Sequence, residues 1–232
     1  MGYFEYFSSN QIAQIHEATL TVMETTGLVF AYAPARDLFA GAGCKIDGQR
    51  VFFPKKLVEE QIEKAPSQFI LHARNPEKNV VIGGDNIAFV PCYGAPFVHD
   101  LDKGRRQGTL EDYHNFAKLA FETPYIDITG GMMTEPNDVP VDQRNAERLY
   151  ASMILSDKPF MGAGTGAADA RQTIEMASMV FGSREEMAKK PPFISILCSL
   201  TPLAFDDKMC GGIMEYANAG MPQLMMLEAA FR

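Results

Sequence analysis

The segment 86–110 carries the side chains that we consider first as candidates for chemistry. Its residues 87–90 form a short apolar run typical of a buried strand, and a proline ends that run. Beyond the run, Tyr93 and Phe97 stand on either side of Gly94, on what the pattern indicates is irregular backbone. Aromatic side chains on a loop after a strand lie where strand-and-helix scaffolds bind their ligands. Tyr93 and Phe97 are therefore candidate ligand-binding residues, and the alternative is that both rings fill the core beneath the loop.

A carboxylate and a thiol end two later apolar runs. Glu228 follows the run 223–227, which is where a barrel enzyme places a catalytic residue, although a structural ion pair explains such a carboxylate equally well. Cys198 ends the run 193–198 and is a conceivable zinc ligand. Catalytic zinc needs three protein ligands, and the four cysteines and four histidines show no ligand spacing. We therefore expect no metal site and no disulfide framework.

The elements that must position these residues alternate between strand and helix from residue 87 onward. Further strands are predicted at 125–129, 160–165, 193–198 and 223–228, and helices at 141–156, at 168–181 and from Asp206 or Asp207 to Gly220. Thr109 is expected to cap an earlier helix, with Asp112 in the place of the usual capping-box glutamate. Strands that are apolar through most of their length suit a parallel sheet buried on both faces, so the pattern predicts an α/β fold with right-handed crossovers.

Residues 1–85 form a different kind of segment. We expect a first helix capped by Ser8, Ser9 or Asn10 and ended by Gly27, a second that Pro34 opens, and a third at 57–64. Short strands are expected at 51–53, 69–72 and 79–82. This part of the chain reads as a compact α+β region without a chemical motif.

Composition limits the classes of function. The 232 residues are 47% hydrophobic and carry a net charge of −8, which fits a globular protein and argues against a nucleic-acid partner. The first residues have neither the basic nor the apolar region of a signal peptide, and no apolar run approaches eighteen residues. We therefore expect a soluble, cytoplasmic protein without a membrane partner. The glycine-rich segment 162–166 lacks the third glycine of the dinucleotide fingerprint, so no nucleotide site is expected there.

An ordered set of short segments resembles the trimethylamine methyltransferase family, which includes the non-pyrrolysine glycine betaine:corrinoid methyltransferases. The segments are GLVF at 27–30, AGC at 42–44, FPKKLVE at 53–59, AP at 65–66, HARNP at 72–76, VIGG at 81–84, the whole of 93–112, NDVP at 137–140, SDKP at 156–159 and TPL at 201–203. None is specific alone, but together they cover essentially the whole chain.

The resemblance implies a fold and a reaction. The fold is a partial TIM (β/α)₈ barrel: residues 1–85 are an N-terminal α+β extension, and residues 86–232 supply four to five βα units, the first half of the barrel. The family moves a methyl group from a methylamine or quaternary amine to the Co(I) of a partner corrinoid protein, so no cofactor is bound directly. The chain is then the N-terminal half of a longer enzyme and is expected to be inactive alone. The preferred amine, the presence of pyrrolysine in the parent and a homo-oligomeric state remain open.

The implied chemistry assigns roles to residues of the opening segment. A quaternary ammonium leaves as a neutral tertiary amine, so no proton moves and no catalytic triad is expected. An aromatic cage holds such a cation, with Tyr93 and Phe97 as its candidates and Phe89 as a weaker one. His99 is a candidate hydrogen-bond donor to a betaine carboxylate, or a structural histidine. The alternatives are a zinc-dependent corrinoid methyltransferase that uses Cys198 and a non-catalytic amine-binding half-barrel.

Overall fold

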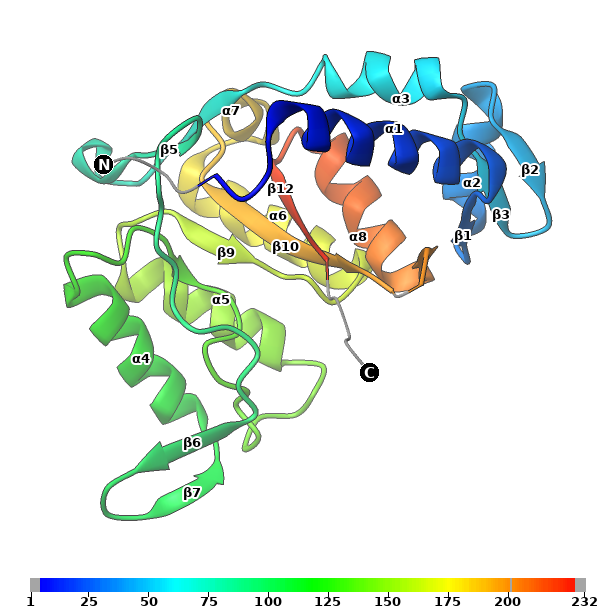
Figure 1. Cartoon of the computed structure of the whole chain (residues 1–232). Coiled ribbons are helices and arrows are strands. Elements are labelled where there is room, and N and C mark those ends of the chain that lie inside the picture. The colour runs from blue at the N-terminus through cyan, green and yellow to red at the C-terminus, as the bar shows by residue number, and fades with distance from the viewer. Residues whose placement is uncertain (1–4, 201, 228–232) are drawn as a thin grey trace. The chain divides into compact units, whose positions relative to one another are not determined.

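The computed structural model describes residues 5–200 and 202–227, which form two units (Figure 1). The first unit comprises the described residues 5–66, 199–200 and 202–207, and the second comprises residues 67–198 and 208–227. The first unit therefore takes in only part of the segment 1–85, because residues 67–85 belong to the second unit. Among the described residues, no helix combines the length and the apolar character that crossing a lipid bilayer requires.

The first unit packs helices against a small sheet. Its helices are α1 (Ser9–Thr25), α2 (Ala33–Gly41) and α3 (Lys55–Ile62), and its strands are β1 (Leu28–Phe30), β2 (Lys45–Asp47), β3 (Arg50–Phe52) and β11 (Ala204–Phe205), in the order β11-β1-β3-β2. Ser8 caps α1 in a capping box with Gln11, as expected from the sequence. Four phenylalanines form the aromatic centre of this unit, with ring centroids 4.8–5.9 Å apart: Phe30, Phe39, Phe53 and Phe205.

The second unit is built on a sheet whose strands follow one another in chain order. The strands are β8 (Thr129–Gly130), β9 (Phe160–Gly162), β10 (Phe193–Ser199) and β12 (Gln223–Leu227), in the order β12-β10-β9-β8, and β8, β9 and β10 are parallel. The helices between them are α5 (Arg144–Leu155), α6 (Ala167–Phe181), α7 (Arg184–Lys189) and α8 (Asp207–Asn218) (Figure 1). This confirms the predicted α/β class with a parallel sheet.

Alternating side chains of the central strands bury both faces of this sheet. Phe160, Phe193 and Leu197 pack into one core with apolar residues of α5 to α8. Met161 and Ile194 point to the other core, which includes the β4–β5 hairpin of strands Gln68–Leu71 and Val80–Gly83. The short 3₁₀ helix η1 (Pro76–Lys78) joins these two strands. The hairpin is bonded to the amino ends of the strands, because the backbone N–H of His72 donates to Pro191 just before β10.

A second hairpin and a helix precede the sheet in the chain. Strands β6 (Phe97–Asp100) and β7 (Gly104–Gln107) pair antiparallel, and α4 (Leu110–Glu122) follows them. Thr109 and Asp112 form the predicted capping box at the start of α4. Phe97 therefore belongs to a strand and does not lie on irregular backbone.

Two of the predicted strands are absent or much shorter. Residues 87–90 form no strand, and of 125–129 only Thr129 lies in one. The two segments do meet, because Phe89 O accepts from the backbone N–H of Asp127 and the Phe89 N–H donates to the Asp127 carboxylate at 2.7 Å. The side chain of Asp127 thus takes a donor that a strand would use, and Pro91 has no N–H to extend a ladder.

Candidate functional site

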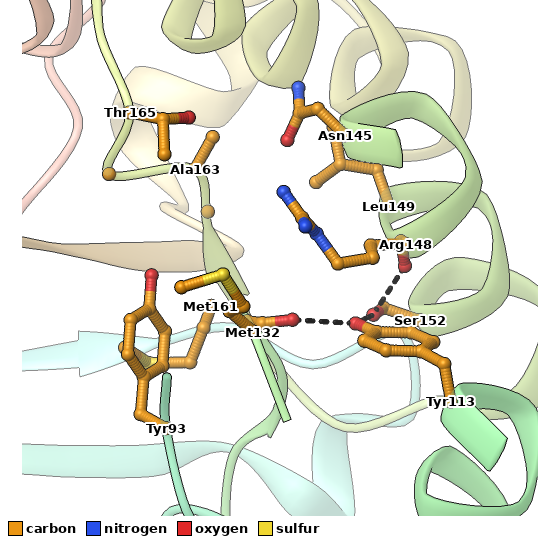
Figure 2. Close-up of a pocket in the computed structure, with 13 residues that line it drawn as sticks. Tyr93, Tyr113, Met132, Asn145, Arg148, Leu149, Ser152, Met161, Ala163 and Thr165 are labelled. Carbon is orange, nitrogen blue, oxygen red and sulfur yellow. Dashed lines mark hydrogen bonds between the residues drawn. The ribbon is translucent and has the colours of Figure 1, made fainter. Parts of the chain in front are cut away.

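A small cavity lies at the carboxyl ends of β8 and β9. Its walls come from the loop after β8, the loop after β9, one face of α5, and the two tyrosines Tyr93 and Tyr113 (Figure 2). The cavity has a volume of about 20 Å³, enough for one or two groups the size of a water molecule. Parallel α/β sheets and barrels bind their ligands at this edge of the strands.

Tyr93 forms one wall of the cavity, and Gly131 makes room for its ring. A Cβ atom on Gly131 would lie 2.7 Å from Cε2 of Tyr93 and 2.9 Å from Cβ of Met161, and the residue has a φ of +73°. Only glycine meets both conditions without strain. Burial raises the pKa of the Tyr93 hydroxyl, and the charge of Arg148 opposes this shift. The ring is therefore a neutral phenol at neutral pH.

Backbone hydrogen bonds fix the segment after Tyr93 to the loop after β8. The N–H of Gly94 donates to the carbonyl of Met132 at 2.7 Å, and the N–H of Glu135 donates to the carbonyl of Ala95 at 3.0 Å. Because these two bonds lie on consecutive residues of the segment, the position of Tyr93 follows that of the loop.

The side chain of Glu135 ties the same loop to α5. One carboxylate oxygen accepts from Nη1 of Arg144 at 3.1 Å and the other accepts from Nη1 of Arg148 at 2.6 Å. Deeper in the wall, the Tyr113 hydroxyl donates to the carbonyl of Gly131 at 2.7 Å and lies 3.1 Å from Oγ of Ser152. Burial raises the pKa of Tyr113 to about 12, so this hydroxyl stays protonated and holds the loop.

The other predicted site residues lie elsewhere. Phe97 and His99 line a separate, larger cavity of about 400 Å³, which also includes residues of α4. The guanidinium of Arg105 stacks over the Phe97 ring, 3.8 Å from its centroid. Phe89 is largely exposed, and Glu228 lies outside the described residues. The structure thus places Tyr93 in one cavity and Phe97 with His99 in another.

The cysteine that we considered as a zinc ligand lies in the third strand of the parallel sheet. Cys198 is half-buried in β10. Within 5–200 and 202–227, no three His, Cys, Asp or Glu side chains come together in an arrangement that would hold a metal ion. No sulfur–nitrogen donor set is therefore seen around Cys198 in this part of the chain.

The residues that the sequence analysis missed come from α5. Asn145, Arg148 and Ser152 are buried although they are polar, and they line the cavity together with Leu149. Their spacing of three and four residues puts them on one helix face. Polar residues on the same face as a core leucine were a signal available in the sequence, since a buried polar side chain on a helix needs a partner.

Comparison of the amino-acid sequence with known proteins identifies the family. The family described as Trimethylamine methyltransferase (MTTB) matches residues 1–229. The chain is 45% identical over 217 residues to a glycine betaine methyltransferase of Desulfitobacterium hafniense (strain Y51), covering 94% of this chain and 45% of that protein. It is 28% identical over 226 residues to the trimethylamine methyltransferase MttB of Desulfitobacterium hafniense (strain DSM 10664 / DCB-2), covering 95% and 45% of the two chains.

A third relative has a different substrate in its name. The proline betaine:corrinoid methyltransferase of Eubacterium limosum is 23% identical over 232 residues, covering 95% of this chain and 47% of that protein. The chain thus spans about half the length of the curated relatives it matches. The family match over nearly all of its residues shows that the chain belongs to the trimethylamine methyltransferase family.

Proposed function

We propose that the protein containing this chain transfers a methyl group from a quaternary amine of the glycine betaine type to the Co(I) corrinoid of a partner protein. The structural observation that supports this is the position of the Tyr93 ring at the carboxyl edge of the parallel sheet. The ring fits there because Gly131 has no side chain. The 45% identity to a glycine betaine methyltransferase supports the same substrate class. The corrinoid is the methyl acceptor and comes with the partner, so the chain itself needs no resident cofactor.

The sheet supports a barrel as the parent fold. In a (β/α)₈ barrel, each strand lies next to the strand that follows it in the chain, whereas an open doubly wound sheet reverses its order. The four strands from β8 to β12 show no reversal. We infer that residues 86–232 form the first half of such a barrel and that residues 1–85 form an extension before it. The chain matches 45% of the length of each of two relatives, which supports a parent protein with a second half of the barrel.

The proposed reaction asks little acid–base chemistry of the protein. A quaternary ammonium leaves as a neutral amine, so the residues must bind the cation, align one methyl group and exclude water. A tyrosine face attracts an ammonium by about 0.5–1 kcal/mol when exposed and by about 2 kcal/mol or more when desolvated. Tyr93 is half-buried and meets this requirement. Phe97 and His99 would join the same ligand through a displacement of the β6–β7 hairpin. Glu228, which follows β12 in the sequence, is retained as a candidate catalytic residue.

Methyl transfer to the corrinoid partner tests the proposal directly. The protein is mixed with its corrinoid protein in the Co(I) state, and the absorption of methyl-Co(III) is followed with glycine betaine or trimethylamine as the donor. We expect rapid methylation with glycine betaine and little with trimethylamine, because trimethylamine leaves as a neutral amine only while it stays protonated, whereas the charge of a quaternary ammonium is permanent. Equal rates with both donors would refute the preference for a quaternary amine. No methylation with any methylated amine would refute the proposed methyltransferase function.

A further inference from the structure

Arg148 reaches into the cavity with more hydrogen-bond donors than it uses. Its side chain is only 10% exposed, and it extends from α5 into the space that Tyr93, Ala163 and Thr165 enclose from the other side (Figure 2). A guanidinium has five N–H donors. Among the described residues, the guanidinium of Arg148 makes one hydrogen bond, from Nη1 to Glu135. None of the unused nitrogens of Arg148 is fully buried, and the side chain lines the cavity, so these donors are free to bind an acceptor that enters it.

The charge beside the cavity favours an anionic acceptor. Glu135 is shared by Arg144 and Arg148, so two guanidinium groups face a single carboxylate and one positive charge is left over. The Arg144 guanidinium also donates to the carbonyls of Val139 and Asn137, and Arg144 does not line the cavity. On the other side of the cavity, the hydroxyl of Thr165 donates a hydrogen bond to the carboxylate of Asp169. Arg148 is therefore the cationic side chain that can meet a ligand here.

The glycine-rich segment after β9 gives the cavity its opposite wall. A Cβ atom on Gly164 would lie 2.4 Å from the carbonyl oxygen of Ile196 and 3.6 Å from the hydroxyl of Tyr93. The backbone of Gly164 therefore passes close to β10 and brings the wall beside the tyrosine. At about 20 Å³, the space holds one or two groups the size of a water molecule, so a flat carboxylate fits it better than the bulkier trimethylammonium group.

We propose that this cavity binds the carboxylate of a zwitterionic quaternary amine, that Arg148 recognises it, and that the ammonium end stays outside against Tyr93. This inference rests on the proposed function and specifies its substrate class. In a betaine, one methylene separates the ammonium from the carboxylate, so the two groups can reach neighbouring walls of one site. Choline and trimethylamine lack the carboxylate and would leave the donors of Arg148 without a partner. The site therefore selects betaines over these amines.

Binding measurements on the full-length protein test the role of Arg148 separately from catalysis. The dissociation constants of glycine betaine and choline are measured by calorimetry for the parent, for Arg148→Gln and for Arg144→Gln. Arg148→Gln should weaken glycine betaine roughly tenfold to hundredfold, as expected for a charged hydrogen bond, and leave choline almost unchanged. Arg144→Gln breaks the matching ion pair to Glu135 outside the cavity, so it should preserve the ratio of the two constants.

Each other outcome has a definite meaning. Equal losses for glycine betaine and choline in Arg148→Gln would make Arg148 a structural residue and overturn the inference. Unchanged glycine betaine affinity would mean that the cavity holds only water, and the proposed function would stand. If glycine betaine does not bind at all, the affinity for acetate, which has the carboxylate without the ammonium, shows whether the carboxylate site exists. If acetate binds in an Arg148-dependent way while glycine betaine does not bind, the carboxylate site stands and the proposed function fails; if neither binds, both fail.

Discussion

The ring of Tyr93 occupies the space into which a side chain on Gly131 would project, with Cε2 of the ring 2.7 Å from the position of that absent Cβ. The carbonyl of the same glycine accepts a hydrogen bond from the hydroxyl of Tyr113. One residue after β8 thus positions the half-buried Tyr93 by its lack of a side chain and the buried Tyr113 by its backbone. The ring that lines the cavity therefore depends on a glycine far from it in sequence.

Gly131→Ala should therefore reduce methyl transfer by more than its effect on stability explains. The left-handed φ of +73° costs a non-glycine residue about 1–3 kcal/mol, and the new methyl group also displaces the ring of Tyr93. Gly104→Ala is the matched control, because Gly104 has a φ of +65° but nothing lies within 4 Å of its absent Cβ. Both variants should unfold at lower urea concentration, and only Gly131→Ala should lose about tenfold or more in the rate of corrinoid methylation. Equal rates for the two variants would mean that the position of Tyr93 does not matter.

Lys158 should contribute strongly to the stability of the second unit. It is 8% exposed, and its ammonium donates to the carbonyls of Ala120, Thr123 and Ile126 at 2.6–3.0 Å. It thereby satisfies carbonyls at the end of α4, and Lys158→Met would remove this donor from all three. The loss falls mainly on the buried carbonyl of Ala120, because the carbonyl of Thr123 also accepts from the N–H of Ile126. We expect a loss of about 2–3 kcal/mol in the free energy of unfolding. Lys118→Met, on the exposed face of α4, should change it by less than about 0.5 kcal/mol.

The ion pair at the start of α4 should make stability fall in acid. The hydrogen bonds of Arg106 hold the pKa of Asp112 far below its ordinary value of 3.8, with bonds from Thr109 in support. A carboxyl group with a depressed folded-state pKa stabilises the fold above the unfolded pKa, and this contribution is lost as pH falls below about 4 toward the folded pKa. The difference in unfolding free energy between the parent and Asp112→Asn should therefore be constant from pH 7 to pH 5 and shrink below pH 4. A difference that does not change with pH would contradict this role for the pair.

Local sequence patterns predicted most of the elements, because their signals are local. The capping residues Ser8 and Thr109 start helices where expected. The apolar run that became β10 is buried on both faces and therefore resembles a parallel strand from sequence alone. The run at 87–90 failed because the N–H of Phe89 donates to a side chain, that of Asp127, and no periodicity reveals such a partner.

The candidate site was predicted only in part, for a geometric reason. Tyr93 and Phe97 are four residues apart, yet the left-handed backbone at Gly94, with a φ of +85°, and the β6–β7 hairpin place them in different cavities. Arg148 is more than fifty residues from Tyr93 and shares its cavity. The two side chains come together because of the strand order and the ion pairs of Glu135, and local sequence patterns predict neither. A resemblance that runs along the chain identified the family but could not show which side chains face one another.

Substitution of the two aromatic residues tests which of them meets the cation. Tyr93→Ala should weaken betaine-dependent methyl transfer by at least about tenfold, because one desolvated cation–π face is worth roughly the 1.4 kcal/mol that a factor of ten represents. Tyr93→Phe keeps the ring and should lose much less.

Phe97→Ala provides the comparison within the same segment. Arg105 already covers one face of the Phe97 ring, which lines the other cavity, so we expect a smaller effect than for Tyr93→Ala. Rates of methyl-Co(III) formation at saturating and at low glycine betaine would separate a loss of binding from a loss of turnover. A tenfold loss in Phe97→Ala at low substrate, without a loss of thermal stability, would show that the β6–β7 hairpin brings this ring to the ligand. If Tyr93→Ala turns over like the parent and only melts earlier, the tyrosine is part of the core and the cation lies elsewhere.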